Sequence, residues 1–544
     1  MLKKMSLVLS LFLSVGCVAR NFGSKPMSSE YIVGEPRKVF KNYNSSIMCD
    51  TSEYFIADSM ETISKVLKKA YDFKLSLKVV SHEEPHSYSD GICPKKGGIV
   101  LNVAPLNKVL STDLKSETPT AVVQPGILIP DLQKQLDPLG FTFPVSPDYN
   151  GVTIAGAMGS GSHHSSLKIQ SGVADWVEEM TVVNGLGELV RLTADDLNNA
   201  RVHLGLMGVI VELKVKVVPQ YKLKYTVERL DDYNLSSEIE GKIRAHDFAR
   251  VRWFPTQKKY ALDAFDKVSL DTPGESFDTA WSSVPDLTPL GDAPTNILNN
   301  SKFASCSAEF LRANTYFGSF EKVGSAPGTI VGKSHQMIAG GCEKGKCPWN
   351  KGTTGRTLEV AFPVSELKNW IQDVRSILDV RSACFPINGL YLRFSKASNG
   401  ALSQAFGADT VMFEIHIATG KDPALEIFSD VYDEIVQMSL AKYKGRPHWG
   451  KNNPPIFSKL GPAQFPNWAE FETLRKKMDP DGIFVSKLWQ SVLDSQTGKS
   501  PIIQTEKCGI TRQCYCTIGS AFECGANSSC VEGGFFKEAK VCKK

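Results

Sequence analysis

A glycine-rich stretch, Gly151–Ser166, holds the residues whose types point most directly to chemistry. It reads GVTIAGAMGSGSHHSS, without the Lys-Ser/Thr ending of a P-loop or the GxGxxG spacing. Glycine tolerates positive φ, so the backbone N–H groups of such a loop turn towards one point and bind an anion, for which a diphosphate is suitable. A flexible surface turn is the alternative. A buried loop is favoured by the apolar residues between the glycines, which are Val152, Ile154, Ala155 and Met158.

A second polar loop, Ser81–Asp90, lies about 70 residues before the glycine-rich stretch. It carries His86 between Pro85 and Ser87, shortly after a predicted strand. One interpretation is a histidine that forms hydrogen bonds within its own turn. The other is that the two loops hold a single cofactor from two sides.

The elements that must position these loops follow from hydrophobic periodicity. Up to about residue 222 the pattern indicates an α+β segment rich in strands, and from 223 to 440 it indicates a second sheet with longer elements. Residues 20–48 are expected to form a spacer, and residues 268–302 a surface excursion. The predicted strands are 54–56, 75–80, 98–103, 121–125, 177–183, 188–192, 209–218, 251–254, 358–361 and 390–394, and the predicted helices are 60–71 and 129–139.

Length and composition restrict the class of protein. The 544 residues suffice for two or three domains with a large core. Apolar residues make up 42% and charged residues 22%, as in ordinary globular proteins. A net charge of +4 is too small to indicate a nucleic acid or an anionic membrane as a partner. The sequence contains no internal run of 18 apolar residues, so no membrane span is predicted.

The N-terminus has the pattern of a secretory signal peptide, residues 1–17. Lys3 and Lys4 precede an apolar run, Leu7–Val15, which a small-residue site follows. Cys17 directly after Gly16 also fits a lipoprotein box, so ordinary cleavage and a lipid anchor at Cys17 both remain open. Either outcome predicts a secreted, periplasmic or cell-surface protein.

Cysteine usage supports an oxidising compartment. Twelve cysteines remain when Cys17 is set aside, an even number. Six of them lie in the tail between Cys508 and Cys542, where the absence of CxxC pairs and of histidine disfavours zinc. We therefore expect a small disulfide-rich module at the C-terminus. A disulfide between Cys342 and Cys347 is also expected.

Several motifs together resemble a known family. The Ser81–Asp90 loop and TIAGAMGSGSHHSS resemble the PCMH-type FAD-binding domain of the vanillyl-alcohol-oxidase-like flavoproteins. Gly205–Ile210 resembles the element that closes this domain. Arg446–Lys451 is similar to the His-Trp-x-Lys motif of the sugar-1,4-lactone oxidases, and Asp479–Phe484 to the end of their core. Tyr391–Ser398 and the cysteine-rich tail resemble the plant-type L-gulonolactone oxidases. The resemblance covers roughly residues 49–544.

The resemblance implies an α+β fold in which a two-part FAD-binding domain is joined to a mixed sheet-and-helix cap domain that binds substrate. A small disulfide-rich module follows at the C-terminus. The implied boundaries are 1–17 for the signal peptide, 49–222 for the FAD-binding domain, 223–440 for the cap domain, 441–500 for a segment that packs back on the flavin site and 501–544 for the tail.

The resemblance implies FAD as the cofactor and no metal. His86 becomes the candidate for a covalent bond to the flavin 8α-methyl group, with His82 as its substitute. Ser87 follows His86 as in the family, whereas Glu83–Pro85 replace the small or aromatic residues that precede the family's histidine. The other implied cofactor-binding residues are Ser87, Thr153, Gly156, Gly159, Ser160, Gly161, Ser162, His163, Ser165, Gly208 and Ile210.

On the substrate side, the resemblance assigns catalytic positions to Tyr391, Arg393, His448 and Lys451. Tyr391 stands where the family's Glu-x-Arg pair has glutamate, and Arg393 keeps the arginine. Arg393 would stabilise negative charge on the reduced flavin or hold a substrate oxygen, with a purely structural ion pair as the alternative. Lys451 would be a second cation near the reacting hydroxyl, and His448 a proton acceptor or an orienting group.

The expected function is that of a secreted oxidase of an aldono-1,4-lactone, L-gulono-1,4-lactone first, with dioxygen reduced to hydrogen peroxide. The first alternative is a flavin oxidase or dehydrogenase of another polyol or an oligosaccharide, because Tyr391 replaces the glutamate. The second, from a different class, is a non-catalytic secreted carbohydrate-binding protein with a degenerate flavin fold.

Overall fold

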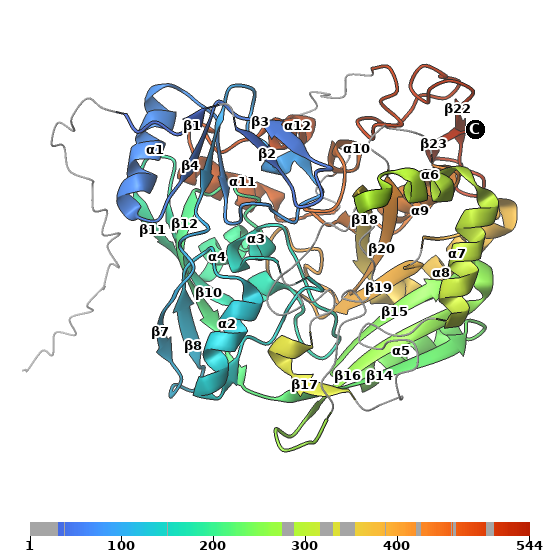
Figure 1. Ribbon diagram of the computed structural model, residues 1–544, viewed down its shortest axis with the longest axis horizontal. Helices are drawn as coiled ribbons and strands as arrows, with labels where there is room; N and C mark the ends of the chain where they lie inside the picture. The colour runs from blue at the N-terminus through green and yellow to red at the C-terminus, as the bar shows by residue number, and fades with distance from the viewer. Residues whose placement is uncertain are drawn as a thin grey trace, which may run out of the picture.

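The structure is a computed structural model, shown in Figure 1. It describes residues 31–36, 38–149, 151–274, 288–315, 330–337, 354–386, 388–419, 426–458, 460, 464–496 and 505–544. The expected signal peptide and the Cys342–Cys347 pair lie outside these residues. Among the described residues, no helix is long and apolar enough to cross a membrane.

The two larger sheets of the N-terminal half lie on the left in Figure 1. In the first, the parallel strands β4, β6 and β5 form the predicted βαβ arrangement with helix α1, which buries Ile63, Val66 and Leu67. The second sheet is antiparallel and has the strand order β11-β10-β12-β8-β7. The bounds are β1 Glu35–Pro36, β4 Glu53–Ile56, α1 Met60–Asp72, β5 Leu77–Val80, β6 Ile99–Asn102, β7 Val109–Asp113, β8 Thr120–Val123, β10 Val177–Val183, β11 Leu189–Leu192 and β12 Val209–Lys216.

An eight-stranded sheet dominates the second half, at the lower right of Figure 1. Its strand order is β17-β14-β16-β15-β19-β20-β18-β21. Helices α5, α8 and α9 share one hydrophobic core with this sheet. The bounds are β14 Lys222–Asp231, α5 Leu235–Ala245, β15 Phe248–Phe254, β16 Lys259–Val268, β17 Val331–Lys333, β18 Thr354–Pro363, α8 Leu367–Val380, β19 Leu390–Ser395, β20 Thr410–Thr419, α9 Ser429–Lys442 and β21 Arg446–Pro447.

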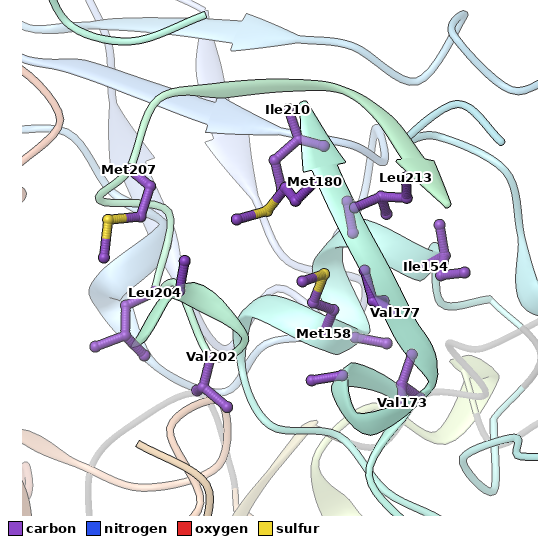
Figure 2. Packing of buried hydrophobic residues seen from close by; sticks show 14 of the residues in the cluster. Ile154, Met158, Val173, Val177, Met180, Val202, Leu204, Met207, Ile210 and Leu213 are labelled. Atoms are coloured by element: carbon purple, nitrogen blue, oxygen red, sulfur yellow. The ribbon is translucent and has the colours of Figure 1, made fainter. Parts of the chain in front are cut away.

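The middle of the glycine-rich stretch is a short helix, which corrects the expected loop of positive-φ glycines. Residues Ile154–Gly159 form the short helix α3, capped by the Thr153 hydroxyl, which accepts from the N–H of Gly156. Within the described part of this stretch, only Gly161 has positive φ, at 75°. Ile154 and Met158 pack into the core with Met180 of β10 and Leu213 of β12 (Figure 2). Packing against the sheet therefore overrides the low helix propensity of glycine.

Most predicted elements are present, and their bounds differ for local reasons. The helix expected over 129–139 is α2, Ile129–Leu136, followed by a 3-10 turn that contains Pro138. The strand expected over 209–218 ends at Lys216, and β13, Val218–Pro219, pairs instead with β9, Phe141–Thr142. The expected surface excursion contains the helix α6, Ala293–Asn300, next to α7, Lys302–Thr315. The expected spacer contains β1 and the hairpin of β2, Val39–Lys41, and β3, Met48–Asp50.

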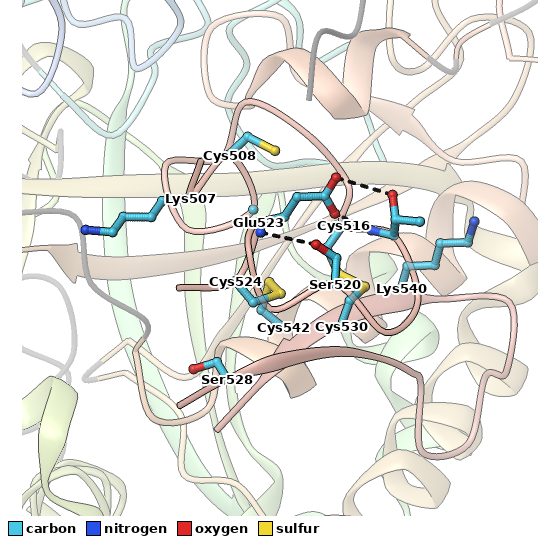
Figure 3. The surroundings of a disulfide bond; sticks show 12 residues. Lys507, Cys508, Cys516, Ser520, Glu523, Cys524, Ser528, Cys530, Lys540 and Cys542 are labelled. Carbon is cyan, nitrogen blue, oxygen red and sulfur yellow. Dashed lines mark hydrogen bonds between the residues drawn. A yellow bond between two sulfur atoms is a disulfide. The ribbon is translucent and has the colours of Figure 1, made fainter. Parts of the chain in front are cut away.

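The cysteine-rich tail forms a disulfide-linked module around the hairpin of β22, Ser529–Glu532, and β23, Lys540–Lys543 (Figure 3). It is fixed to α9 by Glu434, whose carboxylate accepts from the N–H groups of Gly534, Phe535 and Phe536 at 2.8, 2.8 and 2.7 Å. A buried carboxylate with three backbone donors is well satisfied. The disulfides are Cys508–Cys514, Cys516–Cys530 and Cys524–Cys542, with Cys49–Cys93 and Cys306–Cys384 elsewhere.

Ten of the thirteen cysteines are thus paired in the described residues. Thiol titration of the denatured, unreduced protein should therefore find at most three free thiols. The same titration after reduction is the control and should find all cysteines of the chain. Eight or more free thiols before reduction would show that the tail is not fully held by disulfides, because seven cysteines lie outside it. Each disulfide contributes roughly 2–4 kcal/mol to such a module.

Candidate active site

A cavity of about 790 Å³ lies between the N-terminal half and the inner face of the eight-stranded sheet. The glycine-rich segment and the Ser81–Asp90 loop line one part of it, and strands β19 and β20 line another. A cavity of this size suits a cofactor or another ligand of comparable size. The expected site residues that line it are His86, Ser87, Thr153, Gly156, Gly159, Ser160, Ser162, His163, Gly208, Ile210, Tyr391, Arg393, His448 and Lys451.

Two expected cofactor residues, Gly161 and Ser165, are not part of the lining. The N–H of Gly161 donates to the carbonyl of Met158 at 3.1 Å and closes the turn after α3. The Ser165 hydroxyl donates to the carbonyl of Ala249 and accepts from the N–H of Phe394 at 3.0 Å. Ser165 therefore fastens the end of the glycine-rich stretch to the large sheet rather than facing the cavity.

The glycines along the cavity are explained by close packing. A Cβ atom at Gly159 would lie 2.4 Å from the His203 ring, and one at Gly208, where φ is 130°, would lie 2.4 Å from the carbonyl oxygen of Val183. A Cβ at Gly156 would lie 3.0 Å from the Thr153 hydroxyl and 3.4 Å from that of Ser81. A side chain at these positions would displace the neighbouring protein atoms, so the glycines allow the close packing that shapes this part of the lining.

His86 lies in an aromatic cage beside the cavity. Its ring stacks on Tyr43, with centroids 4.0 Å apart at 19°, and contacts Tyr149 at 4.2 Å. Burial lowers the pKa of His86 to about 3, with a further contribution from the positive charge of Lys451. The imidazole is therefore neutral at physiological pH and keeps a nitrogen lone pair.

Four charged side chains form a network on the inner face of the large sheet. Arg393 donates to Glu359 at 2.5 Å and to Glu414 at 2.8 Å. Lys451 donates to the same carboxylates, at 2.8 and 2.7 Å. Glu414, Arg393 and Lys451 line the cavity, whereas Glu359 is fully buried behind them.

Strand alternation explains why these charges meet. In β19, Leu390, Leu392 and Phe394 enter the core shared with the helices, so Tyr391 and Arg393 face the other way. The same alternation turns Glu359 of β18 and Glu414 of β20 to that inner face. Glu414 pairs in register with Tyr391 and with Glu359, which brings the three strands' polar side chains together.

The cations keep both carboxylates ionised. Burial alone would raise the pKa of Glu359, but Lys451, His163 and Arg393 lower it well below its usual range. The pKa of Glu414 is likewise lowered, because His416, Lys451 and Arg393 outweigh its burial. Conversely, the two carboxylates raise the pKa of Arg393 despite desolvation. The network is thus a set of fixed charges rather than a proton exchanger.

Two of the histidines that line the cavity, His448 and His163, have defined proton positions. His448 Nδ1 accepts from the N–H of Gly450 at 3.0 Å, and burial lowers its pKa to about 3, so the neutral ring carries its proton on Nε2. His163 faces two acceptors, the carbonyl of His164 through Nδ1 and Glu359 through Nε2, both at 2.8 Å. Burial lowers the pKa of His163, so the neutral ring carries one proton, and the ionised carboxylate of Glu359 favours that proton on Nε2.

Tyr391, expected to be catalytic, has a structural contact that the sequence did not indicate. Its hydroxyl donates to Asp148 at 2.5 Å, and Asp148 also forms an ion pair with Arg250 of β15. Asp148 directly precedes Tyr149, which contacts His86. Tyr391 thus fixes the segment that holds the His86 cage, while its ring contributes to the cavity lining.

The sequence interpretation missed Glu359, Glu414 and Asp148. The carboxylate absent at position 391 is supplied by neighbouring strands, through Glu359 and Glu414. A signal existed in the sequence, since Glu359 stands among apolar residues of the predicted strand 358–361 and Glu414 among those of a segment that was not predicted as a strand. The strand order that places both beside Arg393 was not visible.

This combination of a glycine-lined cavity and fixed cations, on a two-part α+β fold, defines the class of FAD-dependent oxidoreductases that act on CH–OH groups with oxygen as the acceptor. The family model for an FAD-binding domain matches residues 52–193. The model for D-arabinono-1,4-lactone oxidase matches residues 213–492, more than half of the chain. The chain belongs to the D-arabinono-1,4-lactone oxidase family. The alternative of a non-catalytic carbohydrate-binding protein is set aside.

Individual relatives agree with the family. L-gulonolactone oxidase 5 of Arabidopsis thaliana is 26% identical over 484 residues, which cover 82% of this chain and 80% of that protein. L-gulonolactone oxidase of Mus musculus is 24% identical, with 83% and 98% covered. A solved structure of a solvent-stable cholesterol oxidase has the same fold, with a TM-score of 0.66 and 16% identity over 84% of this chain and 97% of that one.

The charged network generates a prediction about stability. Arg393→Leu and Glu359→Leu should each lower the free energy of unfolding by about 3–5 kcal/mol, because each removes one partner from two buried charges and leaves the network with an excess of one sign. The double variant should lose less than the sum of the two. Denaturant unfolding of the four proteins measures this coupling.

The matched control is Arg244→Leu, which breaks an ion pair between Arg244 and Asp409. The side chain of Arg244 is 41% exposed and that of Asp409 is 26% exposed. It should cost less than about 1 kcal/mol. Additive effects at Arg393 and Glu359, or single effects as small as that of the control, would contradict the proposed network.

Proposed function

We propose that this protein is a secreted FAD-dependent oxidase of an aldono-1,4-lactone, with L-gulono-1,4-lactone as the first substrate and hydrogen peroxide as the second product. The observation that carries the proposal is the contact of Arg393 and Lys451 with Glu414 in a cavity continuous with the glycine-lined segment. The similar proteins of Arabidopsis thaliana and Mus musculus are L-gulonolactone oxidases. The disulfides support secretion, since they persist in oxidising compartments.

The residues around the cavity fit FAD. The glycines at 156, 159 and 208 leave the lining open, and Ser81 and Thr153, hydrogen-bonded at 2.6 Å, add hydroxyl groups beside it. When bound, FAD supplies the capacity to accept a hydride from a carbon that carries a hydroxyl group. The ends of the two N-terminal loops would hold the cofactor, which leaves the charged network for the substrate.

The network can orient a hydroxyl and stabilise developing negative charge. Two N–H groups of Lys451 are used by carboxylates, and the third is available to a substrate oxygen, since the side chain is 15% exposed. Glu414 is an ionised acceptor for a second hydroxyl, as a polyhydroxylated lactone requires. Burial lowers the pKa of His163, so its neutral ring leaves the charges of the two cations and two carboxylates balanced, and Lys451 and Arg393 carry the positive charge that reaches the cavity. Preorganised positive charge in such a site stabilises an oxyanion.

His448 acts in this proposal as an orienting group and not as the proton acceptor. Its Nδ1 lone pair is used by Gly450, and its Nε2 carries a proton. Its buried position makes the imidazole a weak base. His448 therefore donates a hydrogen bond into the cavity, and the hydroxyl proton leaves to solvent.

Another polyol or an oligosaccharide is the second candidate for the substrate. The cavity continues past Glu414 towards Phe385 and Tyr432, beyond the space that a single lactone ring needs beside Lys451. The fold similarity to cholesterol oxidases does not extend to substrate, because ionised Glu414 and Lys451 would be poorly solvated beside a sterol.

Turnover tests the proposal. Purified protein should oxidise L-gulono-1,4-lactone with release of peroxide, and faster than alditols or oligosaccharides in the same panel. Lys451→Met should slow reduction of the flavin by roughly 100-fold, because one preorganised donor to the reacting oxygen is lost. Stopped-flow absorbance of the flavin-loaded variants measures this rate.

Arg244→Leu is the control and should reduce at the parent rate. Equal rates for Lys451→Met and the parent would remove Lys451 from the reaction. Activity confined to alditols or oligosaccharides would select the second candidate.

We propose further that His86 holds FAD covalently. Its neutral imidazole has the lone pair that bond formation needs, and the cage of Tyr43 and Tyr149 fixes the ring beside the cavity. A nitrogen–carbon bond replaces one imidazole N–H and one 8α-methyl C–H bond. The two electrons and two protons released reduce dioxygen, the acceptor of the enzyme, to hydrogen peroxide.

Acid precipitation tests the bond. Flavin should remain in the pellet of the parent protein, and mass spectrometry should find it on a peptide that contains His86. His86→Ala should release its flavin, whereas the control His82→Ala, in the same loop, should not. Release of flavin from the parent would refute the covalent bond and leave FAD binding intact.

A further inference from the structure

Lys78 is a buried lysine that the proposed reaction does not use. It lies in β5, its residue is 4% exposed, and it lines the cavity. Its Nζ donates to the carbonyl oxygen of Leu204 at 3.3 Å. Among the described residues no carboxylate forms an ion pair with it, in contrast to Lys451 with its two carboxylates.

An ammonium group in such a place is costly without an anion. Removal of a charge from water costs several kcal/mol unless an opposite charge compensates it. Burial accordingly lowers the pKa of Lys78 to about 7. In the protein without a ligand, Lys78 is therefore partly neutral near pH 7, and an anion beside it would restore the charge.

The ammonium group lies next to the glycine-rich segment. Leu204, which accepts from Lys78, also donates its N–H to the carbonyl of Gly159 at 3.0 Å. A Cβ atom at Gly205 would lie 2.9 Å from Lys78 Nζ, so the glycine makes room for the amine. Ser81, three residues after Lys78, lies on Thr153 at the start of α3.

The distribution of cations along the cavity points to the same ligand. Among the described lining residues before position 223, Lys78 is the one lysine or arginine. The N-terminal part of the lining thus has one lysine or arginine that can compensate a multiply charged anion. The remaining lysines and arginines of the lining belong to later segments and are Arg252, Arg312, Arg393 and Lys451.

We propose that Lys78 binds the diphosphate of FAD, and that the protein takes up a proton at Lys78 Nζ when FAD binds. The proposal rests on the FAD site of the proposed function, but not on the choice of sugar or on the bond to His86. Charge-assisted hydrogen bonds to a diphosphate are stronger than neutral ones, which gives the amine a reason to be buried here.

The direction of the pH dependence follows from the two states. Below pH 7, Lys78 is charged with or without the ligand, so binding takes up no proton. As the pH rises above 7, the free protein loses this proton and the complex keeps it, so affinity falls and uptake approaches one proton. The titratable neighbour His203 does not interfere, because burial lowers its pKa to about 4 and leaves it neutral throughout.

Calorimetric titration of the full-length protein tests the proposal. The His86→Ala background, freed of flavin, is titrated with FAD, ADP and adenosine at about pH 8.5, in two buffers of different ionisation enthalpy. We expect uptake of close to one proton with FAD and ADP and none with adenosine. This part needs no substitution at position 78.

Lys78→Met in the same background should abolish the uptake and weaken FAD and ADP by roughly 10–100-fold, while adenosine binds as before. Its thermal midpoint without ligand should be equal or higher, because a buried amine is replaced by an apolar chain of similar length. The control Lys74→Met, exposed and four residues away, should change nothing.

Three results would overturn the proposal. Lys78→Met could bind ADP as tightly as its parent, proton uptake could be absent from the parent, or adenosine could weaken as much as ADP. Each of these leaves FAD binding by the parent intact. Failure of the parent to bind FAD at all would refute the FAD site itself and the proposal with it.

Discussion

The structure of the site depends on the burial of one carboxylate. Glu359 is fully buried and accepts from Arg393 and Lys451 with one oxygen, and from His163 and Gln404 with the other. Its backbone N–H donates to Asn452 Oδ1 at 3.1 Å. Without these donors the charge would be too costly to bury. The donors come from four separate segments of the chain: the glycine-rich stretch, β19, the residues around Gln404 and Arg446–Lys451. The hydrogen bonds to this one carboxylate therefore hold these four segments together.

This arrangement separates the roles of similar residues. Glu359 and Glu414 bind the same two cations, yet one is sealed in the protein and the other faces the cavity. The sealed carboxylate sets the positions of the cations, and the exposed one can meet a ligand. Tyr391 and Asp148 form a second contact between the two halves, on the side of the cavity that holds His86.

The sequence predicted the parts of the fold that depend on local pattern. The βαβ unit around α1, the hairpin of β10 and β11 and strand β19 are where periodicity placed them. Arg393 and Lys451 were identified by motif, but their shared carboxylates depend on the pairing of β18, β20 and β19, which no local pattern encodes. The prediction of a positive-φ loop in the glycine-rich stretch was wrong for a related reason, because tertiary packing makes Ile154–Gly159 a helix. Lys78 looked like an ordinary strand residue, and its burial became visible only in three dimensions.

The attachment of the tail has a consequence for how the protein matures. Arg512, within the cysteine-rich module, binds Glu426 at 2.7 Å, and Glu426 belongs to the wall of the cavity. Arg512 also binds Asp433 of α9, so the module contacts both the wall of the cavity and α9. Synthesis proceeds from the N-terminus, so this wall receives its last partner only after translation of the tail and oxidation of its cysteines. Completion of this wall of the cavity is thereby coupled to the folding of the cysteine-rich module, so a chain whose tail has not yet folded lacks one of the charged partners of Glu426.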